Sequence, residues 1–286
     1  MLGPSMVGQS INKFELGKKF GEGRLGEVFE AINRETGGKV AIKLFKDEAS
    51  RRHEIQGFFH DVRALRPISH ASMAKIIDFG LREGDGRAYV ITELLGGESL
   101  GARIQRGRFS TTQTADVVQQ VARALMVAAG VGVMHHALKP SNIFFTPDLD
   151  RASQERVIVV DFGLARLVAT KLEFGNPQYL APEQWTGTAT DNSADIYALG
   201  CLAFEMMTGR PPFKTDSHVS AREKHLRDAA PTVRSQVPDA GAVIDRLIGR
   251  MLEKKPQDRP KSLRDLAKLF DLLVGLEAPL GETTHD

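Results

Sequence analysis

The chain has 286 residues, 42% of them hydrophobic and 26% charged, and its 38 Lys and Arg against 36 Asp and Glu give a formal net charge of +2. Such a composition is ordinary for a globular protein, and the small net charge speaks against a nucleic-acid partner or a membrane surface. The one cysteine, Cys201, excludes a disulfide and a thiolate metal site within the chain, and its apolar surroundings in the sequence predict burial. No stretch reaches the roughly 18 apolar residues of a membrane span, and the N-terminus lacks the segments of a signal peptide. We therefore expect a cytoplasmic protein, or the cytosolic domain of a longer one.

Residues from about 14 to 89 have the pattern of an antiparallel sheet. Five short segments rich in β-branched and aromatic residues are separated by Gly, Asn and Asp turns: FELGKKF, GEVFEAINR, KVAIKLF, AKIIDFG and AYVITEL. One helical stretch, roughly residues 49–65, interrupts them. This part of the chain is therefore predicted to be a small, sheet-rich lobe.

From about residue 99 the apolar residues recur at helical spacing. Ser110 and Gln113 form a capping-box pattern, and one apolar face follows: Val117, Val121, Ala124, Leu125 and Ala128. Residues 193–210 are apolar nearly all round, which predicts a helix buried at the centre of a domain, and residues 239–255 and 262–276 read as amphipathic helices. The predicted class is α+β, with a sheet-rich N-terminal lobe, a connection near residues 92–98 and a larger helical C-terminal lobe.

A glycine motif, G-x-G-x-x-G-x-V, spans Gly21, Gly23, Gly26 and Val28. Glycines allow a backbone to approach phosphate oxygens closely, because no side chain stands in the way. Dinucleotide-binding folds have similar spacing, but between a strand and a helix. Strand-like residues follow this motif, so a phosphate-binding hairpin is favoured over a dinucleotide-binding turn.

Three further segments carry residues suited to phosphate chemistry. Lys43 ends the strand-like VAIK, where it is either a solvated strand end or a clamp on phosphates. Asn142, three residues after Lys139, and Asp161, at the end of a buried strand, offer the oxygen ligands that suit Mg²⁺. Asp161 begins the sequence Asp-Phe-Gly. The same three residues also occur from Asp78, where we interpret them as a strand end and turn.

In this order the motifs resemble those of a protein kinase of the Ser/Thr type, over residues 14 to about 275. The sequences of these motifs are most similar to those of bacterial eukaryotic-like (Hanks-type) kinases. The resemblance also covers Glu183, in Ala-Pro-Glu, Arg259 and Asp195. It implies that Glu183 and Arg259 form an ion pair and that Asp195 braces the catalytic loop. It implies a bilobal fold that uses ATP and Mg²⁺ to phosphorylate Ser or Thr hydroxyls of a protein. The implied ranges are an N-terminal extension at 1–13, an N-lobe at 14–92, a hinge at 93–98, a C-lobe at 99–275 and a tail at 276–286.

The resemblance also assigns nucleotide-binding roles. The three glycines cover the phosphates, Lys43 holds the α- and β-phosphates, and Asn142 and Asp161 bind the metal. Lys43 is expected to be positioned by Asp61, where the family usually has Glu, with Glu54 as the alternative. The other implied nucleotide-site residues are Val28, Ala41, Thr92 at the back of the adenine pocket, Glu93 and Leu95 through their backbones, and Glu98 at the ribose. Glu98 could instead be a charge in a turn.

One position departs from the family pattern. The catalytic loop reads His135-His136-Ala137-Leu138-Lys139-Pro140-Ser141-Asn142, and Ala137 replaces the aspartate that accepts the proton of the substrate hydroxyl. A positioned base contributes roughly 10²–10⁴ in rate, so we expect phosphate transfer to be nearly abolished while nucleotide binding survives. The chain is then either an inactivated variant of a working kinase or a natural pseudokinase that acts as a nucleotide-binding scaffold. A small-molecule kinase is disfavoured because Glu183 and Arg259 are present.

Other departures concern regulation and preference. His136 stands where many kinases have an arginine that pairs with a phosphorylated activation segment, and Thr170 is the only Ser or Thr between residues 161 and 183. We therefore expect weak dependence on phosphorylation of that segment. Asn176 stands where Ser/Thr kinases usually have Thr, which bears on substrate preference. The histidines at 53, 60, 70, 218 and 225 have no metal-ligand spacing and are predicted to be surface or capping residues. Substrate, pathway and oligomeric state stay open.

Overall fold

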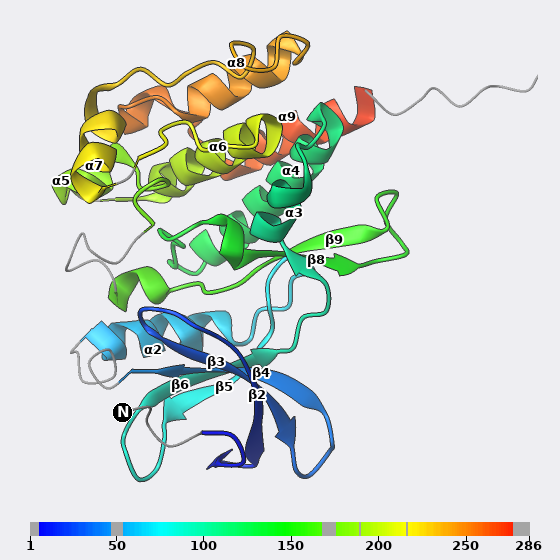
Figure 1. Ribbon diagram of the computed structural model, residues 1–286, viewed down its shortest axis with the longest axis vertical. Coiled ribbons are helices and arrows are strands. Elements are labelled where there is room, and N and C mark those ends of the chain that lie inside the picture. Colours follow the sequence, from blue (N-terminus) through cyan, green and yellow to red (C-terminus); the bar gives the residue numbers. More distant parts are fainter. Residues whose placement is uncertain (1–5, 47–53, 168–175, 189, 216, 277–286) are drawn as a thin grey trace, which may run out of the picture. The chain divides into compact units, whose positions relative to one another are not determined.

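The computed structural model describes residues 6–46, 54–167, 176–188, 190–215 and 217–276 (Figure 1). The chain forms two compact units. The first comprises residues 1–98, 128–135 and 144–175, and the second comprises residues 99–127, 136–143 and 176–286. The predicted α+β class is confirmed, because the first unit is built on antiparallel strands and the second on helices. None of the helices in the described ranges is long and apolar enough to cross a membrane.

The first unit contains a six-stranded antiparallel sheet with strand order β1-β2-β3-β4-β6-β5. Its strands are β1 Ser10–Ile11, β2 Phe14–Glu22, β3 Gly26–Asn33, β4 Lys39–Phe45, β5 Ile76–Leu81 and β6 Ala88–Glu93. The five predicted strands are all present. The two-residue β1 was not predicted, since so short a segment has no alternation to read.

The two faces of this sheet carry different residues. Side chains alternate between faces along a strand, and residues paired across strands share a face. Phe29, Ile42 and Ile91 pair with one another along β3, β4 and β6 and belong to a buried cluster with Phe14 and Leu16. The opposite face carries Val28 beside Lys43, Lys43 beside Val90, and Ala41 beside Thr92. Four of the predicted nucleotide-site residues therefore share one face.

The helix α2 Glu54–Leu65 packs its apolar side on a second cluster of the first unit. Phe58 lies edge-on to Phe45 of β4, with ring centroids 5.3 Å apart. Leu164 and Leu167 of the short 3₁₀ helix η2 Leu164–Leu167 join the same cluster. The helix predicted at residues 49–65 is confirmed from residue 54, and residues 47–53 lie outside the described ranges.

A smaller three-stranded sheet has the order β7-β8-β9, formed by β7 Glu98–Ser99, β8 Ile143–Pro147 and β9 Glu155–Val159. The last residue of β9, Val159, forms a parallel bridge with Met73. Its carbonyl accepts from the Ala74 N–H, and its N–H donates to the Ser72 carbonyl. These bonds fix the end of the strand that leads to Asp161.

The second unit is helical (Figure 1). Its helices are α3 Leu100–Arg106, α4 Thr111–Ala129, α5 Pro182–Thr186, α6 Asn192–Thr208, α7 His218–Arg227, α8 Ala242–Met251 and α9 Leu263–Leu276, with 3₁₀ turns η1 Pro140–Asn142 and η3 Pro256–Asp258. The last two residues of α4 are counted with the first unit. The helices predicted from residues 110, 193, 239 and 262 onward are confirmed, whereas α3, α5 and α7 were not predicted.

Two local predictions in this unit are confirmed in detail. The Gln113 N–H donates to Ser110 Oγ (3.1 Å) and the Ser110 N–H donates to Gln113 Oε1 (2.9 Å), which is the reciprocal capping box. The helix α6 is buried almost all round, and Cys201 within it is fully buried. A helix without a polar face has to lie at the centre of its unit, and α6 packs there against α8.

The prediction that the remaining histidines are surface or capping residues is wrong for His225. This residue of α7 is fully buried, against the rings of Phe213 and Tyr197 at centroid distances of 4.9 and 5.7 Å, and its Nδ1 lies 2.9 Å from the Tyr197 hydroxyl. Burial lowers the pKa of His225 to about 3, and the Lys254 ammonium adds to the shift. No local pattern predicted the burial of His225, because its apolar neighbours come from other segments.

This burial predicts a pH-dependent stability. The folded-state pKa of His225 lies below the ordinary value of about 6.5, so its contribution is complete above that pH and is lost as the pH falls toward 3. From this group the chain should be about 2 kcal/mol less stable near pH 5 than near pH 7. Urea unfolding of the parent chain and of His225→Gln at both pH values measures this difference in the free energy of unfolding. In His225→Gln the difference of about 2 kcal/mol should disappear. The exposed His60, changed to Gln, is the matched control, and an equal effect at both positions would contradict the assignment.

Candidate functional site

The glycine motif forms the turn between β2 and β3, which are antiparallel and adjacent. Glu22 pairs with Glu27 at the end of the hairpin, and the Gly23 N–H donates to the Gly26 carbonyl at 2.8 Å. A strand, not a helix, follows the motif. The hairpin interpretation is therefore confirmed and the dinucleotide-binding turn is excluded for this segment.

The three glycines of the motif differ in the space around them. A Cβ on Gly26 would lie 2.3 Å from the Leu44 carbonyl oxygen and 2.9 Å from the Phe45 Cα, both in β4. A Cβ on Gly21 would meet nothing within 4 Å, and one on Gly23 would meet only the Gly26 oxygen at 3.8 Å. The close approach of β4 therefore requires a glycine at position 26. The space around Gly21 and Gly23 would admit a larger residue.

Lys43 forms an ion pair with Asp161, since its Nζ lies 2.6 Å from Asp161 Oδ2. The two side chains are 16% and 24% exposed, so solvent screens the pair only in part. Asp161 has a left-handed backbone, with φ of +67°, which is uncommon outside glycine and is often found at functional sites. The structure therefore joins the predicted phosphate clamp to the predicted metal ligand inside one unit.

The backbone beside Asp161 is anchored by His135. Its Nε2 lies 3.0 Å from the Val160 carbonyl oxygen, and its ring lies 4.8 Å from that of Phe162. His135 is fully buried. The sequence interpretation gave this histidine no role, although its place at the start of the catalytic-loop motif was a signal.

The two acids considered as partners of Lys43 both lie in α2. Asp61 is buried and lies beside Gly163, where a glycine Cβ would stand 3.2 Å from the Asp61 Cβ. Glu54 is the first residue of the helix. The ion pair that the structure gives Lys43 is with Asp161, and the choice between Asp61 and Glu54 stays a prediction.

A narrow cavity of about 40 Å³ lies in the first unit between α2 and the ends of β6 and β9. Thr92, Asp161 and Phe162 line it, together with apolar residues of α2 such as Phe58 and Val62. Thr92 thus borders a cavity that Asp161 of the ion pair also lines, and its predicted place at the back of an adenine pocket stays a prediction.

Three of the residues expected at the adenine and ribose lie at the end of β6 and in the segment after it. Glu93 is the last residue of that strand, and its carboxylate accepts from the Lys75 N–H at 2.7 Å, so its side chain is directed back to the sheet. Leu95 is partly buried, and Glu98, also partly buried, lies in β7. Their predicted contacts with a nucleotide stay predictions.

Residues 136–142 of the catalytic-loop motif lie in the second unit. The His136 N–H donates to Asp195 Oδ1 at 2.6 Å, as the predicted bracing role of Asp195 requires, and His136 has a left-handed backbone with φ of +53°. Asn142, which is buried, donates from Nδ2 to the Ala137 carbonyl at 3.2 Å. Lys139 directly precedes η1. The loop is therefore held in shape by its backbone, although Ala137 carries no functional side chain.

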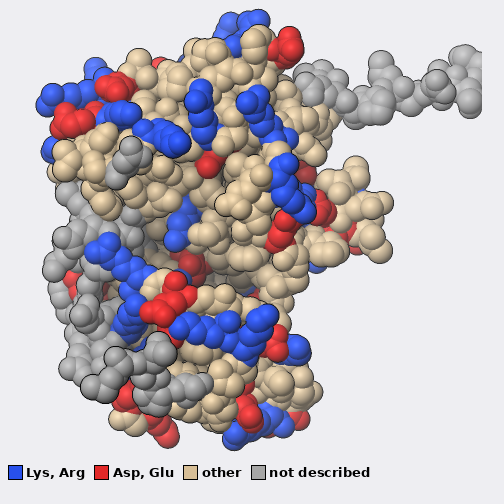
Figure 2. All heavy atoms as spheres, viewed as in Figure 1, with Lys and Arg blue, Asp and Glu red and all other residues tan. Residues whose placement is uncertain are grey.

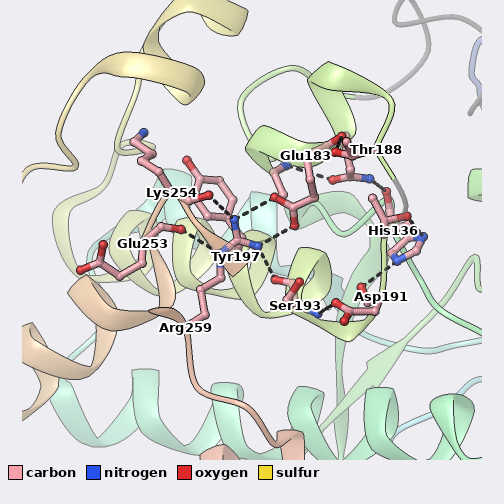
Figure 3. A network of polar contacts seen from close by, with 12 residues as sticks. His136, Glu183, Thr188, Asp191, Ser193, Tyr197, Glu253, Lys254 and Arg259 are labelled. Atoms are coloured by element: carbon pink, nitrogen blue, oxygen red, sulfur yellow. Dashed lines mark hydrogen bonds and ion pairs between the residues drawn. The ribbon is translucent and has the colours of Figure 1, made fainter. Parts of the chain in front are cut away.

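The same loop is tied to α5 and, through it, to Arg259 (Figure 3). Gln184 donates from Nε2 to the His136 carbonyl at 2.9 Å. Its neighbour Glu183 forms a two-oxygen ion pair with Arg259 at 2.6 and 2.8 Å, and Arg259 is fully buried. The predicted pair is thus present. The role of Gln184 was missed, and its place directly after Glu183 was the available signal.

Two oxygen atoms suit the Mg²⁺ ion that the motifs imply. Because Asn142 donates through Nδ2, its Oδ1 is oriented away from that bond and is left to accept. Lys43 engages one oxygen of Asp161 and leaves Oδ1 for another partner. Carboxylate and amide oxygens are the donors that Mg²⁺ prefers, and such an ion keeps several of its waters. The chemistry of each residue, taken by itself within its own unit, therefore fits the ion.

Comparison with known proteins identifies a family for residues 14–269 of this chain. A model of the protein kinase domain matches residues 14–269. Serine/threonine-protein kinase PknA of Mycobacterium tuberculosis is 33% identical over 268 residues, which is 90% of this chain and 60% of PknA, and pkn3 of Myxococcus xanthus is 33% identical over 90% of this chain and 49% of its own length. The chain thus spans 60% or less of these relatives. The crystal structure of the M. tuberculosis PknI kinase domain, 22% identical, covers 94% of this chain with a TM-score of 0.77 and shares its fold.

The crowding at Gly26 gives a stability prediction. Gly26→Ala forces β3 and β4 apart and should destabilise the chain by about 1–3 kcal/mol, whereas Gly21→Ala should change stability by less than about 0.5 kcal/mol. Urea unfolding of the two variants beside the parent measures the difference. Equal stability of the two variants would show that the hairpin can shift to make room.

Proposed function

The chain belongs to the protein kinase family, and from that membership we propose that it is a Ser/Thr protein kinase domain that binds ATP and Mg²⁺ but lacks the catalytic base at Ala137. Members of this family use ATP and Mg²⁺ to phosphorylate proteins. One observation carries the proposal: the loop around Ala137 keeps its backbone hydrogen bonds, while the residue itself ends in a methyl group.

The residues that the family resemblance assigns to the nucleotide support the proposal, with Asp61 standing where the family usually has Glu. We assign the phosphates to the hairpin of Gly21, Gly23 and Gly26 and to the Lys43 ammonium, whose place on the sheet face is fixed by its pairing with Val28 and Val90. We assign the adenine to the same face of the sheet and to the segment that follows β6. The residues assigned to adenine and ribose are Val28, Ala41, Thr92, Glu93, Leu95 and Glu98.

Asn142 and Asp161 would hold Mg²⁺, which neutralises phosphate charge when it is bound. The Lys43 ammonium 2.6 Å from Asp161 supplies a second positive charge near the same carboxylate. The Lys43 ammonium is partly shielded from water, which strengthens its attraction to an anion compared with an exposed lysine. This arrangement supports nucleotide binding without any contribution from residue 137.

Phosphate transfer, unlike nucleotide binding, requires that the substrate hydroxyl lose a proton. The Ala137 methyl cannot accept one, and the loss of a positioned base costs roughly 10²–10⁴ in rate, or about 3–5 kcal/mol of barrier. Lys139 and Asn142 remain in the loop and can still bind phosphate and metal. We therefore infer that the chain binds nucleotide and transfers phosphate very slowly.

The contacts of His136 support weak dependence on activation-segment phosphorylation. Its Nε2 lies 3.0 Å from the Asp191 carbonyl oxygen, and its carbonyl accepts from Gln184. A histidine held in this way is a poorer phosphate partner than the arginine usual in the family. Thr170, the expected phosphorylation position, lies outside the described residues.

A second reading of the same site is a natural pseudokinase, in which bound nucleotide stabilises a scaffold and no phosphate is transferred. Ala137 is the observation that favours it. The two readings differ in what an aspartate at this position would do, since only a disabled kinase has the rest of a working catalytic apparatus.

The first test is Ala137→Asp. Ala137 is only partly buried, so the larger side chain can be accommodated, and phosphate transfer to a generic protein acceptor should rise by about 10²–10⁴. ATP binding, measured by calorimetry with Mg²⁺, should stay within about twofold of the parent, because the base does not contact the nucleotide in this proposal.

Ala137→Asn is the matched control, since it has the shape of aspartate without a basic carboxylate. It should transfer phosphate no faster than the parent. If Ala137→Asp binds nucleotide and also fails to transfer, the pseudokinase reading replaces the disabled kinase. If neither variant nor the parent binds ATP, both readings fail.

The metal assignment is tested with Asp161→Asn. The gain in ATP affinity that Mg²⁺ produces should fall by at least about tenfold, because a neutral amide replaces a charged ligand. Asp78→Asn changes the other Asp-Phe-Gly of the chain, which lies within β5, and should leave that gain unchanged. Equal losses in both variants would remove the metal role from Asp161.

A further inference from the structure

A second cavity, of about 320 Å³, lies within the second unit, apart from the residues assigned to the nucleotide. It is formed by the segment that follows α6, by α7 and by the segment after α7. Its volume is at the lower end of the range for small-ligand sites, about 300–1,000 Å³. Pro211, Pro212 and Pro231 form part of its wall, and their fixed φ angles limit how far that wall can change shape.

The charged side chains of this cavity are mostly basic. Arg210, Lys214 and Lys224 line it, against a single acid, Asp228. Within the described part of the chain, none of these three cations forms an ion pair with Asp or Glu. By contrast, Arg222 and Arg227 of the same helix α7 both pair with Glu223. The cavity therefore holds an uncompensated positive charge of about two, which favours a dianion.

Two of the three cations are held in place by uncharged partners. Arg210 donates from Nε to Gln236 Oε1 at 2.8 Å, which leaves both Nη groups available. Lys224 donates from Nζ to the Lys214 carbonyl at 3.0 Å, with two further donors to offer. The C-terminal end of α7 is fixed in turn by Lys254, which donates to the Lys224 and His225 carbonyls. Donors held in this way lose little conformational entropy when a ligand binds.

The surrounding part of this unit also carries a net positive charge. Residues 209–276 contain 14 Lys and Arg against 9 Asp and Glu, although the whole chain is nearly neutral. Figure 2 shows basic side chains spread, with fewer acidic ones, over the helices of this unit that face the viewer. Such a surface draws anionic groups toward the cavity.

We propose that this cavity binds the phosphate of a phosphorylated Ser or Thr side chain on a partner protein. A phosphomonoester carries a charge of about −1.5 to −2 near neutral pH and offers three acceptor oxygens, which match the guanidinium and the two ammonium groups. The cavity is open to the surface and has room for the side chain that carries the phosphate, with the proline wall beside it. The inference does not depend on catalysis, because binding requires neither nucleotide nor residue 137.

The test compares two synthetic peptide libraries, one with a fixed phosphoserine and one with serine at the same position, by fluorescence anisotropy without nucleotide. The variant Arg210→Gln/Lys214→Gln removes two exposed cations, so its folding is not at risk, and Lys224→Gln tests the third. Arg246→Gln/Lys261→Gln removes the same charge elsewhere in the unit as the matched control. Inorganic phosphate and ADP are added as competitors.

The phosphorylated library should bind at least about tenfold more tightly than the serine library, and the cavity variants should lose at least about tenfold in affinity, as expected when charge-assisted hydrogen bonds are removed. The control variant should lose about twofold or less. Equal binding of the two libraries, or equal losses in cavity and control variants, would overturn the site. Competition by inorganic phosphate at the peptide's own concentration would overturn a protein partner, and competition by ADP would place the peptide in the nucleotide site. A failure here leaves the outcome at Ala137 unaffected, because transfer is measured separately.

Discussion

The buried guanidinium of Arg259 is the constraint on which the second unit depends. Its five N–H groups all have acceptors: the two oxygens of Glu183 and the carbonyls of Ser193, Glu253 and Lys254. Its face lies 4.8 Å from the centroid of the Tyr197 ring. A buried charge is tolerated only when it is paired and hydrogen-bonded, and removal of one partner from such a pair typically costs about 3–5 kcal/mol. This side chain therefore joins α5, α6 and the segment before η3.

The catalytic loop takes its shape from that constraint. Because Glu183 is fixed, its neighbour Gln184 is placed to donate to the His136 carbonyl, while Asp195 of α6 accepts from the His136 N–H. Both backbone groups of His136 are thus held, in a left-handed conformation that a non-glycine residue rarely adopts. A loop supported in this way does not need the side chain of residue 137 for its geometry. That independence explains how an alanine can stand there without loss of the surrounding structure.

In the first unit, the register of the strands determines where the candidate site residues lie. Pairing of β3, β4 and β6 puts Lys43, Ala41 and Thr92 on the face opposite the apolar cluster, and the bridge at Val159 fixes the strand that leads to Asp161. A shift of one residue in register would bury the lysine among aromatic side chains, at a large cost. The Lys43–Asp161 pair at 2.6 Å is the result. The sheet and the bridge at Val159 therefore bring the Lys43 ammonium and the Asp161 carboxylate together without help from the catalytic loop.

The sequence alone determined the strands, the long helices, the capping box and the order of motifs, because each depends on local periodicity or on residues close together in the chain. Through the family resemblance it also indicated the Glu183–Arg259 pair. Only the tertiary structure decided that His225 is buried, that Lys43 pairs with Asp161, and that Gln184 supports the loop. The contacts concerned join residues 12 to 118 positions apart, from Phe213 with His225 to Lys43 with Asp161. The basic cavity belongs to the second kind. Arg210 and Lys214 lie in the segment between α6 and α7, and Lys224 lies in α7. The packing of that segment on α7, which the bond from Lys224 Nζ to the Lys214 carbonyl holds, brings their charges together.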